Sequence, residues 1–377
     1  MKNVMVVKVG STSLINNQGK INVVFLRRLV SVVQGLQKRK KLPLLVVSGA
    51  VAAGKSNVPS LVSYQARASR GQLIIASCIH QLGEKLKIKF SLLLLSKQDI
   101  LDRNRYETLK NTFNECLEMD IVPIINENDA TSATDTHDFV DNDQVATIVG
   151  MITEAQEVFL LTNVAGVFKS DPKKQKENGE TPIAQISDIN DELMRLHIGK
   201  KSLAGRGGME SKLKAARLAS FVGMTTYILN RKKIQHILEI IDGKPCQGTV
   251  CLPWNQPIVL TDRSRWLITS QTSSASIKID TGAVEALRKR KSLLAVGVKQ
   301  IFGSFNAFDS VEVIDEKNRP IALGISDLSS ANLNKIIASS KKPFNIEVMH
   351  ANHLILFPTW SQTFNATNLL ITSSGFS

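Results

Sequence analysis

Two lysines, each next to glycines, are the side chains of this sequence best suited to binding phosphate. Lys8 lies near the end of a short apolar run and is followed by Gly10, so its ammonium group can lie beside backbone N–H groups that hold a phosphate. A lysine at a strand end is, however, often merely solvated. Lys212 follows a glycine-rich segment, residues 205–208, and opens a helix predicted over Leu213–Val222, which makes it a second candidate for phosphate binding.

Carboxylates and carboxamides form a second group of candidate residues, downstream of an apolar run at Ile121–Ile125. They lie in two short segments, Asn126–Asp129 and Asp138–Asp143. Such side chains either cap a loop through local hydrogen bonds or bind a cation. The spacing of a calcium-binding loop is absent, and Asp and Asn are suitable partners for a substrate ammonium group.

A third segment, Gly49–Ser56, matches the G-x-x-x-x-G-K-S pattern of a nucleotide-binding P-loop. In a P-loop a long helix begins directly at the Lys-Ser pair. Here Pro59 follows at once and leaves no room for that helix, and no later strand ends in the aspartate that binds Mg²⁺ in such proteins. We therefore predict that the match is accidental and that a helix begins at Gly49 and ends near Gly54.

The elements that must position these residues alternate along the first 250 residues. Short, nearly continuous apolar runs predict strands covered on both faces, at Val4–Val9, Leu44–Val47, Phe90–Leu95, Ile121–Ile125, Val158–Thr162 and Thr225–Leu229. Helical periodicity lies between them, for example over Val23–Arg39 and Gln72–Leu86. This alternation predicts an α/β fold with a mostly parallel sheet between two helical layers, and ligands then bind beyond the carboxyl ends of the strands.

The length of 377 residues suggests two domains. Prolines between residues 245 and 260 mark a boundary, which separates an α/β domain over residues 1–255 from a small, mainly β module over residues 270–355. Residues 361–377 carry no charged side chain and are rich in Ser, Thr and Asn, so we expect a weakly ordered tail.

The composition places the chain among ordinary globular proteins. Hydrophobic residues make up 43% and charged residues 21%, which argues against global disorder. No apolar stretch is long enough to span a bilayer, and the N-terminal run predicts a first strand rather than a signal peptide. Four scattered cysteines, at positions 78, 116, 246 and 251, fit a reduced, cytoplasmic protein without a zinc site.

The formal charge of +14 suggests a nucleic-acid partner, but the basic residues are spread along the chain. Residues 261–377 contain 13 basic and 9 acidic side chains, a net of +4, and the other +10 lies in residues 1–260. The longest basic run of the C-terminal part, Arg288–Lys291, is typical of a solvated helix end. An excess of positive charge also suits a protein that binds ATP, so charge alone does not distinguish these functions.

In their order along the chain, the motifs resemble those of the glutamate 5-kinase group of the amino-acid kinase family. The matching segments are Lys8-Val9-Gly10-Ser11, Ser48–Gly54, Asn126–Asp129, Asp141–Asp143, Leu161-Thr162, Asp171-Pro172 and Gly207-Gly208-Met209-x-x-Lys212. Past the linker, four further segments are similar to the PUA domain of bacterial members: Ile279–Ala283, Lys291–Leu294, Gly297-Val298 and Gly303-x-Phe305. The resemblance covers roughly residues 3–350. It implies a three-layer α/β/α sandwich with a mostly parallel sheet, followed by a small PUA-like domain.

The resemblance also implies roles for individual residues. The catalytic set comprises Lys8 and Lys212, which would bridge the phosphates, with Asp143 and Asp141 orienting them. The substrate-binding set comprises Ser48, Asp129, Asn142 and Asn126. The nucleotide-binding set comprises Gly10, Thr162, Asn163, Gly205, Arg206, Gly207, Gly208, Met209 and Lys212. No residue is assigned to a protein-held metal site, and Mg²⁺ would arrive bound with ATP.

The implied activity is ATP-dependent phosphorylation of the γ-carboxylate of L-glutamate, the first step of proline biosynthesis. That carboxylate is already ionised at neutral pH, so no general base is needed, and the six histidines lie outside every motif. The resemblance further implies a homo-oligomer, a dimer or tetramer, and makes feedback inhibition by proline a possibility to test. As the composition indicates, we expect a cytoplasmic protein without membrane association. RNA binding through the PUA-like domain is an additional possibility.

Three positions depart from the family pattern. Asn163 replaces an aspartate, Val140 replaces a glycine, and Arg206 replaces a threonine, which leaves nucleotide binding and proline inhibition open. Two alternative functions are therefore retained. One is an amino-acid kinase family member with a different acceptor, and the other is a non-catalytic RNA-binding protein that uses the PUA-like module. Both phosphate-binding lysines and the glutamate-binding set are present, which favours an active glutamate kinase.

Overall fold

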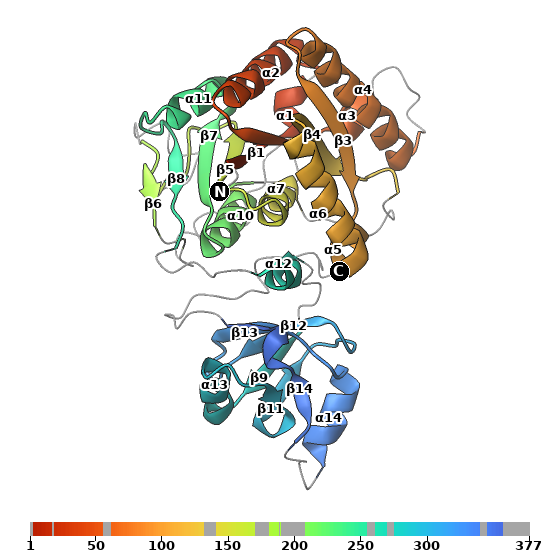
Figure 1. Cartoon of the computed structure of the whole chain (residues 1–377), viewed down its shortest axis with the longest axis vertical. Coiled ribbons are helices and arrows are strands. Elements are labelled where there is room, and N and C mark those ends of the chain that lie inside the picture. Colours follow the sequence, from red (N-terminus) through yellow and green to blue (C-terminus); the bar gives the residue numbers. More distant parts are fainter. Residues whose placement is uncertain are drawn as a thin grey trace. The chain divides into compact units, whose positions relative to one another are not determined.

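The computed structural model describes residues 3–16, 19–55, 62–131, 141–169, 181–187, 189, 208–254, 261–269, 275–339 and 345–356. The chain divides into two compact units, Met1–Pro257 and Ile258–Ser377, which Figure 1 shows in the colours of the sequence. Among the described residues, no helix is long and apolar enough to cross a membrane. The predicted tail, residues 361–377, lies outside the described residues.

An eight-stranded sheet forms the centre of the first unit, in the order β3-β4-β2-β1-β5-β7-β8-β6. Its strands are β1 Val4–Val9, β2 Leu42–Val47, β3 Lys89–Leu95, β4 Ile121–Glu127, β5 Glu157–Thr162, β6 Gln185–Ile186, β7 Thr225–Asn230 and β8 Thr249–Cys251. All neighbours pair in parallel except β7 with β8. This confirms the predicted α/β fold, and every predicted strand is present. Strands β6 and β8 were not predicted, because segments of two and three residues are too short to show periodicity.

Helices cover both faces of this sheet (Figure 1). They are α1 Ser11–Leu14, α2 Val23–Lys38, α3 Ala50–Gly54, α4 Tyr64–Glu84, α5 Lys97–Leu101, α6 Arg103–Glu118, α7 Asn142–Ile152, α10 Met209–Phe221, η1 Arg231–Lys233 and α11 His236–Ile241. Helix α4 is longer than predicted. It begins at Tyr64 and not at Gln72, because the Ser63 side chain caps it by accepting a hydrogen bond from the Ala66 N–H at 3.2 Å.

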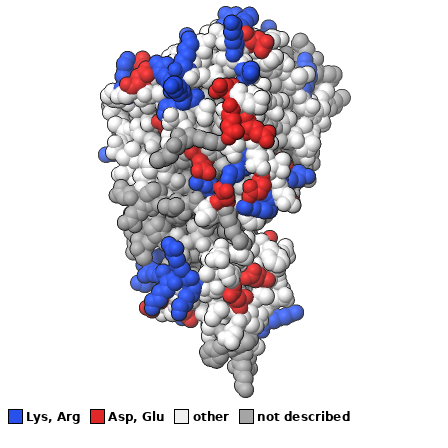
Figure 2. Space-filling view, in the orientation of Figure 1, with Lys and Arg blue, Asp and Glu red and all other residues white. Residues whose placement is uncertain are grey.

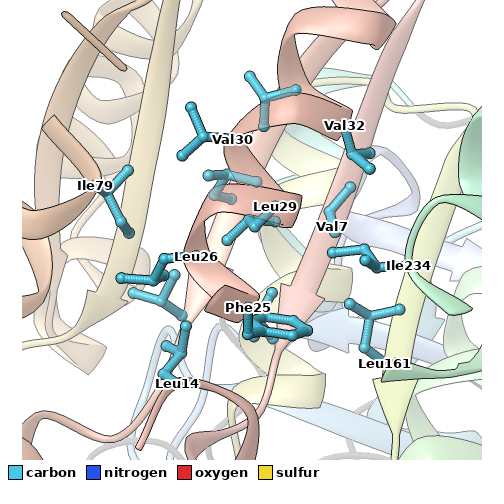
Figure 3. Close-up of a cluster of buried hydrophobic side chains, with 14 of the residues drawn as sticks. Val7, Leu14, Phe25, Leu26, Leu29, Val30, Val32, Ile79, Leu161 and Ile234 are labelled. Atoms are coloured by element: carbon cyan, nitrogen blue, oxygen red, sulfur yellow. The ribbon is translucent and has the colours of Figure 1, made fainter. Parts of the chain in front are cut away.

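Apolar side chains of α2 fill the space between this helix and the sheet. Figure 3 shows Phe25, Leu26 and Leu29 of α2 together with Val7 of β1 and Leu161 of β5. All five side chains are at least nine-tenths buried. Burying a side chain of this size stabilises the fold by about 1.5–3 kcal/mol, so this cluster holds the central strands, and therefore their carboxyl ends, in fixed positions.

The segment with the P-loop pattern contains the short helix α3, which packs against α4. Gly49, which precedes α3, has a φ of +98°, a conformation that favours glycine. Helix α3 ends at Gly54, as predicted, before Lys55. A Cβ atom on Gly54 would lie 1.8 Å from the Arg67 carbonyl oxygen, and one on Gly71 would lie 1.7 Å from the Ala50 carbonyl oxygen. The second glycine of the pattern therefore permits close packing of two helices.

The second unit is mainly β, as predicted. A five-stranded sheet has the order β11-β9-β12-β13-β15, and β10 pairs with β14. The strands are β9 Ser276–Ile279, β10 Leu293–Leu294, β11 Val298–Phe302, β12 Ser310–Ile314, β13 Pro320–Ile325, β14 Glu347–Met349 and β15 Leu354–Leu356, and the helices are α12 Asp262–Thr269, α13 Thr281–Arg288, η2 Ala295–Gly297, α14 Ser330–Ala338 and η3 Ala351–His353. Helix α13 ends at Arg288, and the basic run Arg288–Lys291 is exposed. Figure 2 shows basic and acidic side chains interspersed over the first unit and a group of basic side chains on the second.

Candidate functional site

The predicted site residues that the structure describes in the first unit include several at the end of its sheet where the parallel strands terminate. Gly10 follows β1, Ser48 follows β2, and Thr162 is the last residue of β5. Asn126 is the next-to-last residue of β4, which extends to Glu127, so it belongs to the strand and not to the predicted loop. Because the strands are parallel, residues far apart in the sequence meet at this edge.

The two candidate lysines converge on one buried carboxylate. Asp143 is fully buried, and its Oδ1 lies 2.8 Å from Nζ of Lys8 while its Oδ2 lies 2.9 Å from Nζ of Lys212. Both lysines are more than nine-tenths buried. The Ser211 hydroxyl also donates to Asp143 Oδ2 at 2.9 Å. Strand β1 and the first turn of α10 thus deliver two ammonium groups to the same place.

Burial and charge have opposite effects on the pKa values of Asp143 and Lys8. Burial alone would raise the pKa of Asp143, but Lys212 and Lys8 outweigh it and hold that pKa well below its usual range. Burial would likewise lower the pKa of Lys8, but the charges of Asp143 and Asp141 raise it above its ordinary value. The arrangement therefore keeps Asp143 ionised and Lys8 protonated at neutral pH.

Asp141 has a different environment from its neighbour. Its Oδ1 accepts a hydrogen bond from the Asp143 N–H at 3.0 Å, so it caps the N-terminus of α7. Burial first, and then repulsion from Asp143, raises the pKa of Asp141, with the two lysines acting in the opposite direction. Asp141 thus contributes to the electrostatics of the lysine pair and also fixes the start of the helix that carries Asp143.

Carboxamides form a second cluster at the same edge. Asn142 Nδ2 donates to Ser48 Oγ at 2.6 Å, to Asn126 Oδ1 at 3.2 Å and to the Val47 carbonyl oxygen at 3.3 Å. Three of the four predicted substrate-binding residues are therefore in direct contact. Because Asn142 and Asp143 are consecutive at the start of α7, this cluster adjoins the lysine pair.

Two residues of this site were missed at the sequence level. Tyr64 Oη donates to Asp129 Oδ1, the fourth predicted substrate-binding residue, at 2.8 Å. Gln72 hydrogen-bonds with Asn126 at 3.0 Å. A signal for Gln72 existed, since it is a polar residue on the buried stripe of α4 with Ala68, Ile75 and Ile79. Tyr64 gave no such signal.

The predicted nucleotide-binding residues fall into two groups. At the ends of β5 and β7, Asn163 Nδ2 donates to Thr12 Oγ1 at 3.4 Å, and Asn230 Nδ2 donates to the Asn163 carbonyl oxygen at 3.2 Å. Arg231 also donates to the Thr12 carbonyl oxygen. These contacts place Asn163 beside α1, the short helix that follows Gly10.

The other nucleotide-binding candidates lie at the start of α10. Gly208 precedes this helix and Met209 is its first residue, so both lie within one turn of Lys212. A helix N-terminus of this kind favours phosphate. Gly205, Arg206 and Gly207 lie outside the described residues, as does Val140.

A site that uses ATP must accommodate the Mg²⁺ ion that accompanies the nucleotide. Among the described residues, no group of three or more His, Cys, Asp or Glu side chains is placed to hold a metal ion. Asp143 is already paired with two lysines. This donor set fits Mg²⁺ held mainly by nucleotide phosphates and water, the usual arrangement for this ion.

Comparisons with known proteins identify the families that the two units match. The model described as the amino acid kinase family matches residues 3–230, and the model described as the PUA domain matches residues 275–342. The chain is similar to glutamate 5-kinase 2 of Pseudoalteromonas translucida, with 35% identity over 94% of this chain and 98% of that protein. It is also similar to the glutamate 5-kinases of Pelagibacter ubique, with 34% identity over 89% of this chain and 90% of that protein, and of Dehalococcoides mccartyi, with 32% identity over 93% and 98%.

Proposed function

This chain belongs to the amino acid kinase family, and from that membership we propose that it is a glutamate kinase, which transfers the terminal phosphoryl group of ATP to the γ-carboxylate of L-glutamate as the first step of proline biosynthesis. The relatives named above, which match it over most of its length, are called glutamate 5-kinases. The names of these relatives indicate glutamate as the acceptor, and the arrangement of the site gives a physical reason why it can be phosphorylated.

One observation carries the proposal, the convergence of Lys8 and Lys212 on Asp143. The chemical difficulty of this reaction is that a carboxylate must approach a polyanionic nucleotide. Two ammonium groups at the meeting point offset that repulsion and stabilise the charge that spreads over the transferring phosphoryl group. Because both lysines are held by one carboxylate, they are positioned before the substrates bind.

The adjacent carboxamide cluster supports the acceptor assignment. We assign Ser48, Asn126, Asn142 and Asp129 to glutamate binding, because a hydroxyl group can donate to the α-carboxylate while amide and carboxylate oxygens can accept from the ammonium group. The substrate γ-carboxylate would then extend toward the lysine pair. It is ionised at neutral pH, so it attacks the terminal phosphorus directly and no residue needs to remove a proton.

We assign the nucleotide to the strand ends that carry Gly10, Thr162 and Asn163 and to the start of α10. The N-terminus of α10 and Lys212 would bind phosphate oxygens. Mg²⁺ bound with ATP would neutralise part of the phosphate charge. Gly205, Arg206 and Gly207 are included in this assignment from the resemblance alone.

A hydroxylamine trap tests the proposal. Purified protein is incubated with ATP, Mg²⁺ and L-glutamate, and hydroxylamine converts an acyl phosphate to a hydroxamate that is measured by its colour with iron(III). We expect hydroxamate with glutamate and little hydroxamate with aspartate or N-acetylglutamate. Uridine monophosphate has no carboxylate, so its phosphorylation is measured by ADP release, and we expect little. Absence of hydroxamate with glutamate, together with ADP release on another acceptor, would refute the proposal in favour of a different amino-acid kinase.

The family resemblance also suggests the cellular setting. We propose a cytoplasmic location, which the four free thiols support, and a homo-oligomer, either a dimer or a tetramer. Light scattering measures the oligomeric state. A proline titration in the hydroxylamine assay tests feedback inhibition, and salt-dependent RNA retention tests RNA binding by the second unit.

A further inference from the structure

Gln72 is a buried polar side chain whose orientation is fixed by the backbone. It lies in the middle of α4 and is 4% exposed. Its Nε2 donates to the carbonyl oxygen of Glu127 at 2.9 Å. A carbonyl oxygen can only accept a hydrogen bond, so the NH₂ group of Gln72 must face the Glu127 carbonyl and its Oε1 is left to accept a hydrogen bond from another group.

This orientation passes to two further carboxamides. Asn126 Nδ2 donates to Gln72 Oε1 at 3.0 Å, so Asn126 Oδ1 is directed to the opposite side, where it accepts from Asn142 Nδ2 at 3.2 Å. The far end of the chain is fixed independently, because Asn142 Nδ2 also donates to the Val47 carbonyl oxygen at 3.3 Å. Two backbone carbonyls, on β4 and β2, therefore require the same orientation of all three amides.

The amide chain leaves one polar atom unsatisfied. Asn142 must turn its NH₂ group toward Val47 and Asn126, so its Oδ1 faces elsewhere. That oxygen is buried and accepts no hydrogen bond from any described residue. A buried acceptor without a partner destabilises a protein, and a ligand that brings a donor removes this penalty.

We propose that Gln72 is a positioning residue, which fixes Asn126 and Asn142 so that Asn142 Oδ1 accepts a hydrogen bond from the ammonium group of the amino-acid substrate. This inference rests on the proposed glutamate kinase function. It adds a specificity device: the site distinguishes glutamate from dicarboxylates of the same length that lack the amino group. Without Gln72, Asn126 is free to rotate by 180° and Asn142 loses one of the contacts that hold it.

The test replaces Gln72 by Met, which has a similar length and no hydrogen-bonding amide. Two quantities are measured in the hydroxylamine assay, the KM for glutamate and the inhibition constant of glutarate, which is glutamate without its amino group. We expect the glutamate KM to rise about tenfold, the loss typical of a hydrogen bond to a charged group. The ATP KM, the kcat and the glutarate inhibition constant should stay close to their wild-type values.

Ile75→Val is the matched control. Ile75 lies three residues further along α4, is 1% exposed and packs in the same core, so this change lowers stability without altering any amide. We expect its glutamate KM to be unchanged. An unchanged glutamate KM in Gln72→Met would overturn the inference, and so would an equal rise in the glutamate KM and the glutarate inhibition constant.

A double-mutant cycle tests whether Gln72 acts through Asn126. In an Asn126→Ala background, Gln72→Met should cost little further kcat/KM for glutamate, because coupled residues give non-additive effects. Additive losses would contradict the chain of contacts. If Gln72→Met does not fold, Gln72→Leu takes its place in the same measurements. Wild-type protein that forms no glutamyl hydroxamate would instead refute the glutamate kinase proposal itself.

Discussion

Replacing Lys212 by Met removes one of the two ammonium groups and keeps most of the aliphatic side chain. Lys212 is 6% exposed and its Nζ lies 2.9 Å from Asp143, so bulk water cannot replace the charge of its ammonium group. Loss of one preorganised group that stabilises transition-state charge costs about 2.7–4 kcal/mol, or 10²–10³ in kcat. We expect a loss of this size in Lys212→Met.

The same variant should remain folded. Asp143 keeps its contact with Lys8 at 2.8 Å and its hydrogen bond from Ser211 at 2.9 Å, so its buried charge is not left unpaired. The stability loss should therefore be smaller than the about 3–5 kcal/mol that follows complete loss of a buried partner. Urea unfolding measures this loss, and hydroxamate formation under saturating ATP and glutamate measures kcat.

Lys244→Met is the control, because Lys244 is exposed on the same unit and has no place in the site. We expect wild-type kcat from this control. Wild-type turnover by Lys212→Met would refute the reasoning, since the ammonium group would then contribute nothing to the transition state. An unfolded Lys212→Met protein would contradict the argument that Lys8 alone suffices to pair Asp143.

Three further predictions concern the first unit. The folded-state pKa of Asp143 lies below the ordinary value of about 3.9. Ionised Asp143 therefore stabilises the fold above that pH, and this contribution is lost as the pH falls through the lower folded-state pKa. In urea unfolding, the free energies of wild type and Asp143→Asn should differ most at neutral pH and begin to converge below about pH 4. Gly71→Ala would place a Cβ 1.7 Å from the Ala50 carbonyl oxygen, and we expect it to lower the free energy of unfolding by about 1–3 kcal/mol, whereas no loss would show that α3 and α4 can separate freely. Tyr64→Phe removes the 2.8 Å hydrogen bond to Asp129 and should raise the glutamate KM by about tenfold without changing the ATP KM; an unchanged glutamate KM would argue against Asp129 as a glutamate ligand.

The sequence predicts the sheet well because its strands are buried on both faces. Val4–Val9 is apolar at every position except Lys8, and the structure gives β1 these same bounds. Strand ends were less predictable. Polar Asn126 and Glu127 indicate a loop, but they continue β4, because pairing with Leu94 and Leu95 of β3 stabilises them as strand residues despite their polarity.

The candidate site was predictable only in part, for a related reason. Lys8 and Lys212 were identifiable because glycines and a strand or helix end flank each of them. Gln72 and Tyr64 hydrogen-bond with Asn126 and Asp129, at sequence separations of 54 and 65 residues. Local patterns contain no information on such pairings. The predicted helix began at Gln72, whereas α4 begins at Tyr64 after its Ser63 cap. The position of Gln72 in the middle of a buried helical stripe was therefore not recognised.

The shared carboxylate of Asp143 has a consequence for the enzyme between turnovers. Two like charges brought together in a dry interior would push each other apart, and the pocket would have to be rebuilt each time a nucleotide arrived. The Asp143 carboxylate lies between the two ammonium groups and holds them together when no nucleotide is bound. In the proposed reaction, phosphate oxygens of the nucleotide would replace part of this pairing, so the free energy needed to bring the two cations together is spent during folding and not in every catalytic cycle.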